Sequence, residues 1–417
     1  MTSTEVDELY IILVSPNVSE QMGGEAIKAL QIYLELKRQG IRVHQITHER
    51  VKPELDSKYP DMKVSYLSDT KLERTSHRLG FAFGVGLVFL WRAARLAQRI
   101  SKEQRGSIIH FTAPVSPVLP YFRVRGAGII IGPINGNIHY PSAFRDREPL
   151  TYRVRRWLHP FLQLVLRFAI TGKQHADALL VAGGNRTYQS LRMCGCREEQ
   201  FVDSLDSGVL DRLYALPRVT HTGRNLRFFV NGRLVGHKGT DLIIKALKQT
   251  TNAIEFDIIG RGPMLQSLKA LTAQLKLQDR VNFIEWIPDH SKVAETLRQY
   301  RALVFPSLAE ANGIVVQEAM VQGLPVIALN WGGPSLLVTP QTGLLIEPVS
   351  EEHVVSELAK AMDLLAADGA LAEQMSIASR KRALDCGFLW SDVILNWTAV
   401  YRRVREARDK ETHFARV

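Results

Sequence analysis

The sequence predicts an α/β protein with two Rossmann-like, doubly wound domains. Short apolar runs, typical of parallel strands buried on both faces, alternate with segments of helical periodicity along both halves of the chain. Glycine-containing loops follow several of these runs, and ligands of open α/β sheets bind at the carboxyl ends of the strands. The 417 residues are enough for two domains of ordinary size, each with its own core.

The first half opens with a β-α-β pattern. An apolar run at residues 10–15 predicts a strand, and a loop containing Gly23 and Gly24 precedes a helix expected at 26–39. The next strand is expected at 41–47, and right-handed crossovers then favour a doubly wound sheet. Further strands are expected at 107–111, 128–131 and 178–181.

The second half repeats this architecture. A polar stretch at residues 210–227 predicts a linker, and a closing helix with one apolar stripe is expected at 389–409. Between them, strands interleaved with amphipathic helices predict the second Rossmann-like domain: 226–231, 256–259, 281–283, 302–305 and 326–329.

The composition is that of an ordinary soluble globular protein, with 46% hydrophobic and 23% charged residues. Three cysteines (Cys194, Cys196 and Cys386) are too few for a disulfide framework, and Cys-Gly-Cys lacks the second ligand pair of a zinc site. We therefore expect a reducing compartment, and the acidic N-terminus is unlike a secretory signal. Residues 79–91 are uncharged but fall short of the roughly 20 needed to span a membrane, so they predict a core helix or one that dips into a membrane surface.

Positive charge is concentrated in one region. The net charge is +11, and residues 121–175 hold nine Arg or Lys against two acids. Anionic lipid, a lipid-linked phosphate or nucleic acid would each suit such a region. No nucleic-acid-binding motif accompanies it, so we expect no nucleic-acid partner.

Residues 152–168 mix Arg with Trp, Phe and Leu, as interfacial helices do. We therefore predict a cytoplasmic protein that docks, in a salt-sensitive way, on an anionic membrane surface, the inner face of the plasma membrane. Two other interpretations remain open: a merely solvated basic face, and packing of residues 162–166 inside the first domain.

Two glutamates, Glu310 and Glu318, flank the predicted start of a helix at Gly313. The first lies in the loop after the strand 302–305, and the second on the first turns of the helix. Acids in this position fit a ligand site at the carboxyl end of a parallel strand. Glycine at the helix start lets a phosphate approach the free backbone N–H groups. A single acid at a helix start can be explained by its favourable interaction with the helix dipole. The presence of two acids is therefore the observation that indicates a ligand site.

Two cations follow the strand 226–231 in a glycine-punctuated loop. Arg233 offers a planar fork and Lys238 a point charge, a combination that can hold a diphosphate from two sides. Surface Arg and Lys are usually just solvated. Here, however, two more glycine loops follow strands, Gly260-Arg-Gly-Pro263 and Gly332-Gly-Pro334, so the region as a whole predicts a diphosphate site.

Four motifs follow one another along the chain in an order that resembles the C-terminal half of retaining GT-B glycosyltransferases. They are Gly232-Arg-Leu with Lys238-Gly239, then Gly260-Arg-Gly-Pro263, then Glu310 with Glu318, and finally Gly332-Gly333. The closest match is glycosyltransferase family 4 (glycosyl transferases group 1), and the resemblance covers essentially the whole chain. It implies two Rossmann-like domains that face a central cleft. It also implies retaining transfer of a sugar from a nucleotide-diphosphate sugar to a glycan or lipid-linked acceptor, as in polysaccharide biosynthesis.

The resemblance also implies domain bounds and residue roles. Residues 1–210 would bind the acceptor, residues 211–386 the nucleotide sugar, and 387–417 would form a helix that returns to the first domain. The implied catalytic residues are Glu310, Arg233, Lys238 and His110. The implied donor-binding residues, with Glu318 on the ribose hydroxyls, are Gly23, Gly24, Gly262, Ile287, Gly313, Ile314, Val315 and Glu318. The acceptor candidates are Asn135 and His139.

Some of these residues have ordinary structural explanations, since paired glycines occur in turns and a strand-end histidine is often structural. The sequence has no Asp-x-Asp triplet to hold a metal on the phosphates, so we expect a metal-independent enzyme without a cofactor. Three departures from the family pattern (Thr112–Pro114 after His110, Glu285 and Asn312) leave the donor base and sugar open.

Two other functions remain open. A nucleotide-sugar epimerase can share this fold, but it needs acid–base residues around the sugar that the sequence does not supply. A catalytically silent GT-B-like subunit, recruited to membranes by the basic region, would have no reason to keep Arg233, Lys238, Glu310 and Glu318 together.

Overall fold

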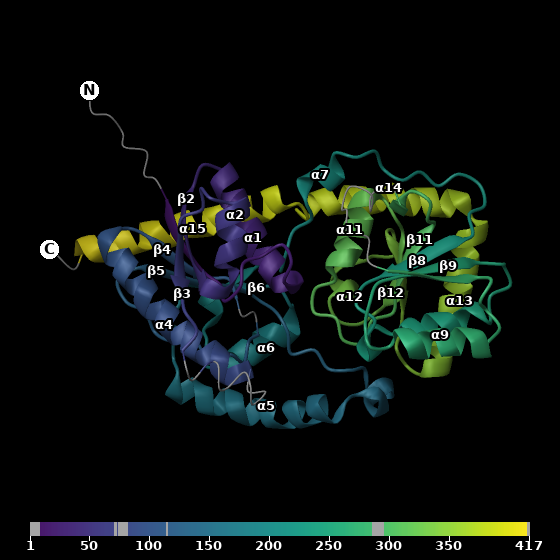
Figure 1. Cartoon of the computed structure of the whole chain (residues 1–417), viewed down its shortest axis with the longest axis horizontal. Helices are drawn as coiled ribbons and strands as arrows, with labels where there is room; N and C mark the ends of the chain where they lie inside the picture. The colour runs from purple at the N-terminus through teal and green to yellow at the C-terminus, as the bar shows by residue number, and fades with distance from the viewer. Residues whose placement is uncertain (1–8, 71–72, 74–81, 114–115, 286–295, 415–417) are drawn as a thin grey trace. The chain divides into compact units, whose positions relative to one another are not determined.

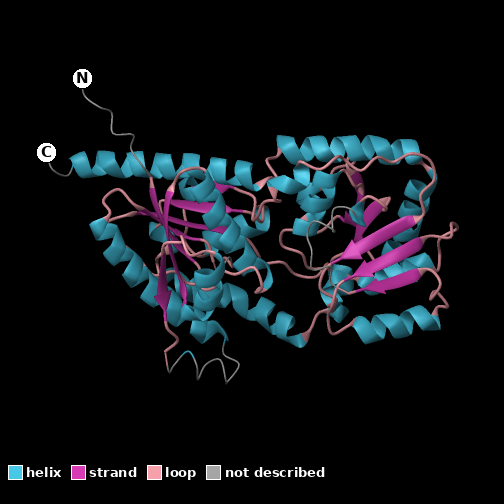
Figure 2. Ribbon diagram, turned by 45° about the horizontal axis from the view of Figure 1, so that its top comes forward, coloured by secondary structure: helices cyan, strands magenta, loops and turns pink. Residues whose placement is uncertain are grey.

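The computed structural model describes residues 9–70, 73, 82–113, 116–285 and 296–414. The chain forms two compact units, which are described separately. Unit 1 comprises Met1–Asn137, Leu158–Ser207 and Trp390–Val417, and unit 2 comprises Ile138–Trp157 and Gly208–Leu389. Each unit contains a sheet with helices on both of its faces (Figures 1 and 2).

The sheet of unit 1 has seven parallel strands in the order β3-β2-β1-β4-β5-β6-β7. The order reverses at β1, which makes the sheet doubly wound. Every residue of β1 is buried, as its continuous apolar sequence predicts, and Ile11 pairs with Ile108 of β4. The strands are β1 (Tyr10–Val14), β2 (Arg42–His48), β3 (Val64–Leu67), β4 (Ile108–Phe111), β5 (Gly128–Ile134), β6 (Ala178–Val181) and β7 (Phe201–Asp203).

The first helix begins at Gly23, three residues before the expected start, although glycine is a poor helix former. Residues 82–91 open the helix α4, in which Phe89 and Leu90 are buried in the core and Trp91 is 43% exposed. The helices that lie wholly in unit 1 are α1 (Gly23–Arg38), α2 (Lys52–Lys58), α4 (Ala82–Glu103), α6 (Asn185–Met193) and α15 (Trp390–Phe414). The helix α5 (Leu150–Ala169) contributes residues to both units.

The sheet of unit 2 has six parallel strands in the order β10-β9-β8-β11-β12-β13. Its central strands β11 and β12 are buried at every residue. The strands are β8 (Arg227–Asn231), β9 (Glu255–Ile259), β10 (Val281–Ile284), β11 (Ala302–Phe305), β12 (Val326–Leu329) and β13 (Gly343–Ile346). The helices are α7 (Asp211–Tyr214), α8 (Thr240–Leu247), α9 (Leu265–Gln274), α11 (Ile314–Gln322), α12 (Pro334–Leu337), α13 (Glu351–Ala367) and α14 (Gly369–Asp385).

A segment from the first half of the sequence, Ile138–Trp157, packs with unit 2. The guanidinium of Arg147 forms ion pairs of 2.9 Å with Asp241 on α8 and of 2.6 Å with Glu351 on α13. The indole N–H of Trp331 donates a 2.8 Å hydrogen bond to the His139 carbonyl. These contacts explain why the segment groups with the second sheet.

All three cysteines are free thiols, and two of them, Cys194 and Cys196, are buried. Among the described helices, none combines the length and the apolar character that crossing a bilayer requires.

Candidate functional site

The centre of the site is an ion pair between Lys238 and Glu310. Lys238 ends a short 3-10 turn (Gly236–Lys238) that follows β8, and Glu310 lies in the loop that follows the neighbouring strand β11. The Lys238 ammonium donates a hydrogen bond to the Glu310 carboxylate, and the two side chains are only 20% and 17% exposed. The sequence places these residues 72 positions apart, and the fold brings them together.

A close backbone approach produces this pairing. A Cβ atom on Gly239 would lie 2.3 Å from the Pro306 carbonyl oxygen, so only glycine allows the two loops to meet here. Leu308 donates its backbone N–H to the His237 carbonyl at 2.7 Å, and the Ser307 hydroxyl donates to the same oxygen at 3.1 Å. Lys238 Nζ also lies 4.9 Å from the centre of the Phe305 ring.

The pKa of His237 reflects the positive charge of the loop that carries Arg233 and Lys238. Burial lowers the pKa of the His237 imidazole, and the charges of Lys238 and Arg233 lower it further against the opposing effect of Glu310. Arg233 itself is exposed and forms part of the loop that follows β8. Of the two cations that the sequence predicted for the diphosphate, Arg233 is therefore the one that faces solvent and Lys238 the more buried one.

The Gly260-Arg-Gly262 loop after β9 packs directly on the loop after β8. Gly232 donates its N–H to the Ile259 carbonyl at 3.0 Å, and Leu234 donates to the Arg261 carbonyl at 2.9 Å. A Cβ atom on Gly262 would lie 2.2 Å from the Leu234 carbonyl oxygen. Gly262 thus supports the loop that carries Arg233 and Lys238.

Glu318 lies on the second turn of α11. Gly313 precedes this helix with a positive φ of 89°, and the Gly313 carbonyl accepts from Val316 and Gln317. The N–H groups that begin a helix have no partner within it, which gives Ile314 and Val315 the geometry of an anion-binding terminus. Burial raises the pKa of the Glu318 carboxyl from 4.5 to about 7, because the charged form loses its contact with water.

The sequence analysis counted the Gly332-Gly-Pro334 loop as part of the diphosphate region but gave Gly332 and Gly333 no role of their own. Gly333 donates its N–H to the Glu310 carbonyl at 2.8 Å, and a Cβ atom on Gly332 would lie 2.5 Å from the same oxygen. The paired glycines after β12 therefore hold the Glu310 loop in place. Their signal in the sequence is the Gly-Gly that directly follows a buried strand.

Three of the predicted residues in unit 1 lie in two different kinds of surroundings. Gly23 and Gly24 open α1, are exposed, and leave open space where a Cβ atom would be. His110 is completely buried at the end of β4. Its Nδ1 shares a 2.7 Å hydrogen bond with the Tyr401 hydroxyl and its Nε2 donates to the Gly132 carbonyl at 2.8 Å. Burial lowers the pKa of His110 to about 3, so the ring is neutral and ties α15 to the sheet.

The two acceptor candidates belong to different units. Asn135 is buried in unit 1, and its side-chain oxygen lies 3.5 Å from the Arg186 guanidinium. His139 is partly buried in unit 2, where its carbonyl accepts from Trp331. Ile287, another predicted donor contact, lies outside the described residues.

One group of described side chains in unit 1 has metal-ligand chemistry. Ligand atoms of His48, Asp69 and Glu73 lie within 4.8 Å of one another. Two arginines already neutralise the carboxylates, since Arg50 lies 2.8 Å from Asp69 and Arg92 lies 3.5 Å from Glu73. This charge balance suits an ion-pair network better than a divalent cation.

Comparison with known proteins agrees with this architecture. Residues 218–382 match the family described as Glycosyl transferases group 1. An uncharacterized glycosyltransferase of Haemophilus influenzae is 32% identical over 174 residues, which cover 40% of this chain and 47% of that protein. A GDP-mannose-dependent alpha-(1-6)-phosphatidylinositol monomannoside mannosyltransferase of Mycolicibacterium smegmatis is 32% identical over 168 residues, 37% of this chain and 42% of that protein. The chain thus matches less than half the length of these relatives.

Among solved structures, HepE of Anabaena in complex with UDP and glucose superimposes with a TM-score of 0.65 at 16% identity, over 95% of this chain and all of that one. The fold is GT-B. In this GT-B chain, the residues from Arg233 to Gly333 that form the site of unit 2 all lie within the part that matches Glycosyl transferases group 1.

Proposed function

We propose that the protein transfers a sugar from a nucleotide-diphosphate sugar to an acceptor and retains the anomeric configuration. The observation that carries this proposal is the Lys238–Glu310 ion pair at the carboxyl ends of β8 and β11. It sets a cation suited to a diphosphate directly beside an acid suited to a sugar. The match of residues 218–382 to Glycosyl transferases group 1 supports the same activity.

In this proposal the donor is bound by its diphosphate and its two sugars. Lys238 and Arg233 hold the diphosphate and stabilise the charge that develops as it leaves. The N–H groups of Gly313, Ile314 and Val315 bind the distal phosphate oxygens. Glu318 accepts hydrogen bonds from the ribose hydroxyls.

Glu310 has the second role at the reacting centre. It orients the transferred sugar and stabilises the positive charge that develops on its ring. Because two basic side chains and a helix terminus neutralise the diphosphate, this reaction needs no metal ion and no cofactor. Two of the similar proteins support a nucleotide-diphosphate donor as a class, because one is GDP-mannose-dependent and the other has a solved structure with bound UDP.

The residues of unit 1 have supporting roles in the proposal. The exposed Gly23 and Gly24 at the start of α1 leave room for a close approach of donor or acceptor. Asn135 and His139 are acceptor contacts. The burial of His110, with both ring nitrogens bonded, suits a positioning residue that fixes α15 against the backbone of β5 at Gly132 rather than a group that touches the sugar.

We also propose that the acceptor is a lipid-linked or polysaccharide intermediate at a membrane surface, where the protein docks through α5. The outward face of this helix is apolar: Trp157, Phe161 and Phe168 are 81%, 68% and 76% exposed. Its inward face carries polar side chains, His159 and Gln163, which are buried.

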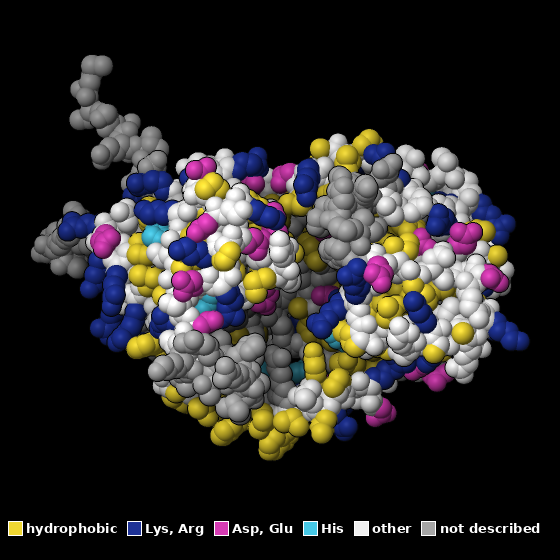
Figure 3. Space-filling model, in the orientation of Figure 1, with side chains coloured by type: hydrophobic (Ala, Val, Ile, Leu, Met, Phe, Trp, Pro, Cys, Tyr) yellow, Lys and Arg dark blue, Asp and Glu magenta, His cyan; other side chains and the backbone are white. Residues whose placement is uncertain are grey.

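Hydrophobic side chains gather at the lower edge of Figure 3, where Figure 1 places α5. The arginines Arg153 and Arg167 on this helix are exposed and suit anionic headgroups. Packing of residues 162–166 inside the domain would leave them covered, but Leu164 is 52% and Val165 43% exposed. A phosphatidylinositol-modifying relative is consistent with a lipid acceptor.

A thermal-shift panel of nucleoside diphosphates and nucleotide sugars tests the donor assignment. We expect one nucleoside diphosphate and its sugar to raise the melting temperature without added metal. In the Lys238→Ala variant this shift should shrink, and turnover should fall about 100- to 1,000-fold, as when one partner of a developing oxyanion is removed.

Normal turnover in Lys238→Ala would refute the site. Analysis of the products separates the alternatives. An epimerised nucleotide sugar would indicate an epimerase, and binding without any transfer or hydrolysis would indicate a silent subunit.

A further inference from the structure

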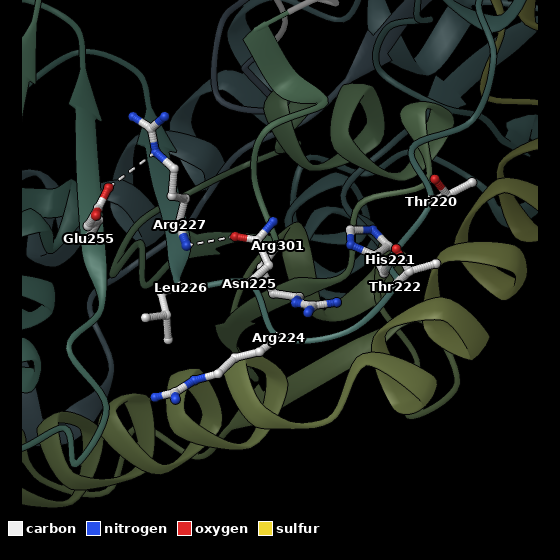
Figure 4. Close-up of a pocket in the computed structure, with 9 residues that line it drawn as sticks. All are labelled: Thr220, His221, Thr222, Arg224, Asn225, Leu226, Arg227, Glu255 and Arg301. Carbon is white, nitrogen blue, oxygen red and sulfur yellow. Dashed lines mark hydrogen bonds and ion pairs between the residues drawn. The ribbon is translucent and has the colours of Figure 1, made fainter.

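Unit 2 has a polar cavity at the edge of the sheet opposite the proposed donor site. It has a volume of about 450 Å³ and lies where β8, β9 and β11 begin (Figure 4). The donor residues follow the other ends of β8, β9 and β11, so the two sites are separated by the length of the strands. Cavities of this size hold small molecules. Its charged and hydroxyl-bearing lining residues are Thr220, Thr222, Arg224, Arg227, Glu255 and Arg301.

Arg301 is the unusual member of this lining. The side chain is fully buried, yet it forms an ion pair with no described carboxylate. One nitrogen, Nη2, donates to the Gly223 carbonyl, whereas Nε and Nη1 meet no acceptor among the residues that the structure describes. Burial lowers the pKa of this guanidinium, against a weaker opposing effect of Asp368. Buried arginines are almost always paired, so this one lacks an expected anion.

The neighbouring charges leave the cavity positive. Arg227 lies 3.2 Å from the buried carboxylate of Asp257 and 3.5 Å from Glu255, so its charge is largely balanced. Arg224 at the rim donates to the neutral side chain of Asn252 at 2.7 Å, and no ion pair joins it to a carboxylate of the described residues. Arg301 and Arg224 therefore form no ion pair with a described carboxylate, although the charge of Asp368 acts on Arg301 from a greater distance.

The remaining polar groups suit an anion as well. Thr220 and Thr222 bring hydroxyl groups to the lining. His221 also lines the cavity, and burial lowers the pKa of its imidazole, so the ring is neutral above its usual titration range. Its Nε2 donates to the Gly323 carbonyl at 3.1 Å, which fixes the ring and the loop that carries both threonines.

We propose that this cavity binds a compact phosphate dianion, either inorganic phosphate or a phosphate monoester, at a site independent of the nucleotide sugar. A dianion against Arg301 and Arg224 would supply the charge that the buried guanidinium lacks. Its binding would also stabilise the loop at residues 219–226 and the start of three strands. The inference does not depend on the proposed function, because none of its residues contributes to the donor site.

Phosphate binding is measured by thermal shift at constant ionic strength, with chloride as the reference salt. The measurement uses the full-length Lys238→Ala variant, so that phosphate binding in the donor site is weakened. We expect phosphate to raise the melting temperature in a saturable way and to slow hydrogen exchange at residues 219–227. When Arg224→Ala is combined with Lys238→Ala, the phosphate concentration that gives half of the shift should rise about tenfold, since a hydrogen bond to a charged group is lost. A compact sugar monophosphate in place of phosphate distinguishes a monoester ligand from the free ion.

Lys381→Ala on the same Lys238→Ala background is the matched control, because Lys381 is a 73% exposed cation of unit 2 outside the cavity. It should leave phosphate binding unchanged. Arg301→Lys keeps the charge but removes the fork, and should weaken phosphate binding if the protein folds. The proposal is overturned if phosphate has no more effect than chloride, or if Arg224→Ala and Lys381→Ala respond alike. Nucleotide binding by the Arg224→Ala single variant is measured in parallel. A failed phosphate-site proposal can then be told apart from a failed donor-site assignment.

Discussion

The two glutamates of the site occupy different environments, and their roles follow from that difference. Glu310 is paired with Lys238, whereas the carboxyl of Glu318 is partly buried and forms no ion pair with a described side chain. We expect Glu318→Ala mainly to raise the KM of the donor, because ribose contacts bind the ground state and the transition state alike. Glu310→Gln should mainly lower kcat, because it removes a charge that the cationic sugar requires. Steady-state kinetics of the two variants checks this, and the opposite pattern would exchange the two roles.

The raised pKa of Glu318 also predicts a pH-dependent stability. The folded protein holds this proton up to about pH 7, whereas an unfolded glutamate loses it near 4.5. The free energy of unfolding should therefore fall as the pH rises through this window, by about 3 kcal/mol. Glu318→Gln removes this penalty, so it should melt higher than the native protein at pH 8 and nearly level with it at pH 4.5. Equal melting differences at both pH values would contradict the assignment.

At the level of residues, the structure brings predicted site residues of unit 2 into contact, whereas it buries His110 of unit 1 among structural partners. The cations and acids after β8 and β11 follow buried strands, and the carboxyl ends of parallel strands meet at one edge. The direct contact of Lys238 with Glu310 could not be predicted, because it depends on the approach of Gly239 to Pro306. For His110, position at a strand end did not reveal that α15 would cover the ring.

Among the elements, the strands that the sequence analysis missed are all at the edges of sheets. β3 and β7 end the order of unit 1, and β13 ends that of unit 2. β3 and β7 are partly exposed and lack the continuous apolar run that identified the central strands, whereas the short apolar run of β13 was overlooked. The first turn of α1 was also missed, because it begins with two glycines, which are poor helix formers.

The helix α5 was predicted as a helix, but periodicity alone does not say which face is buried. Because the exposed face is apolar, vesicle binding should depend on more than charge. We expect co-sedimentation with anionic vesicles at low salt and weaker but measurable binding at high salt, where headgroup attraction is screened. This revises the purely salt-sensitive docking that the arginines predicted.

Single substitutions separate these two contributions. Phe161→Ser should reduce binding to anionic vesicles about tenfold at either salt concentration, because a large apolar side chain no longer leaves water. Leu395→Ser is the matched control, since Leu395 is 59% exposed on α15. Negligible binding to both neutral and anionic vesicles would leave a soluble acceptor as the better interpretation.

For the molecule as a whole, the chemistry of the donor site predicts activity without a metal ion. The positive groups assigned to the diphosphate are Arg233, Lys238 and the start of α11. The His48, Asp69 and Glu73 group has its carboxylates balanced by arginines. Transfer should therefore continue in EDTA. Loss of activity in EDTA that Mg²⁺ or Mn²⁺ restores would show that the phosphate site is wrongly assigned.

The closing helix α15 has a consequence for the order in which the chain becomes structured during synthesis. Trp397 and Tyr401 are fully buried in unit 1, and Tyr401 shares a hydrogen bond with His110, which the ribosome makes 291 residues earlier. Val404 lies so near Gly128 that a Cβ atom there would come within 2.7 Å of it. Unit 2 is complete at Leu389, whereas unit 1 still lacks part of its core. The half of the protein that is translated first is thus the last to finish folding, and a ribosome that stalls before residue 390 would leave it open to chaperones and proteases.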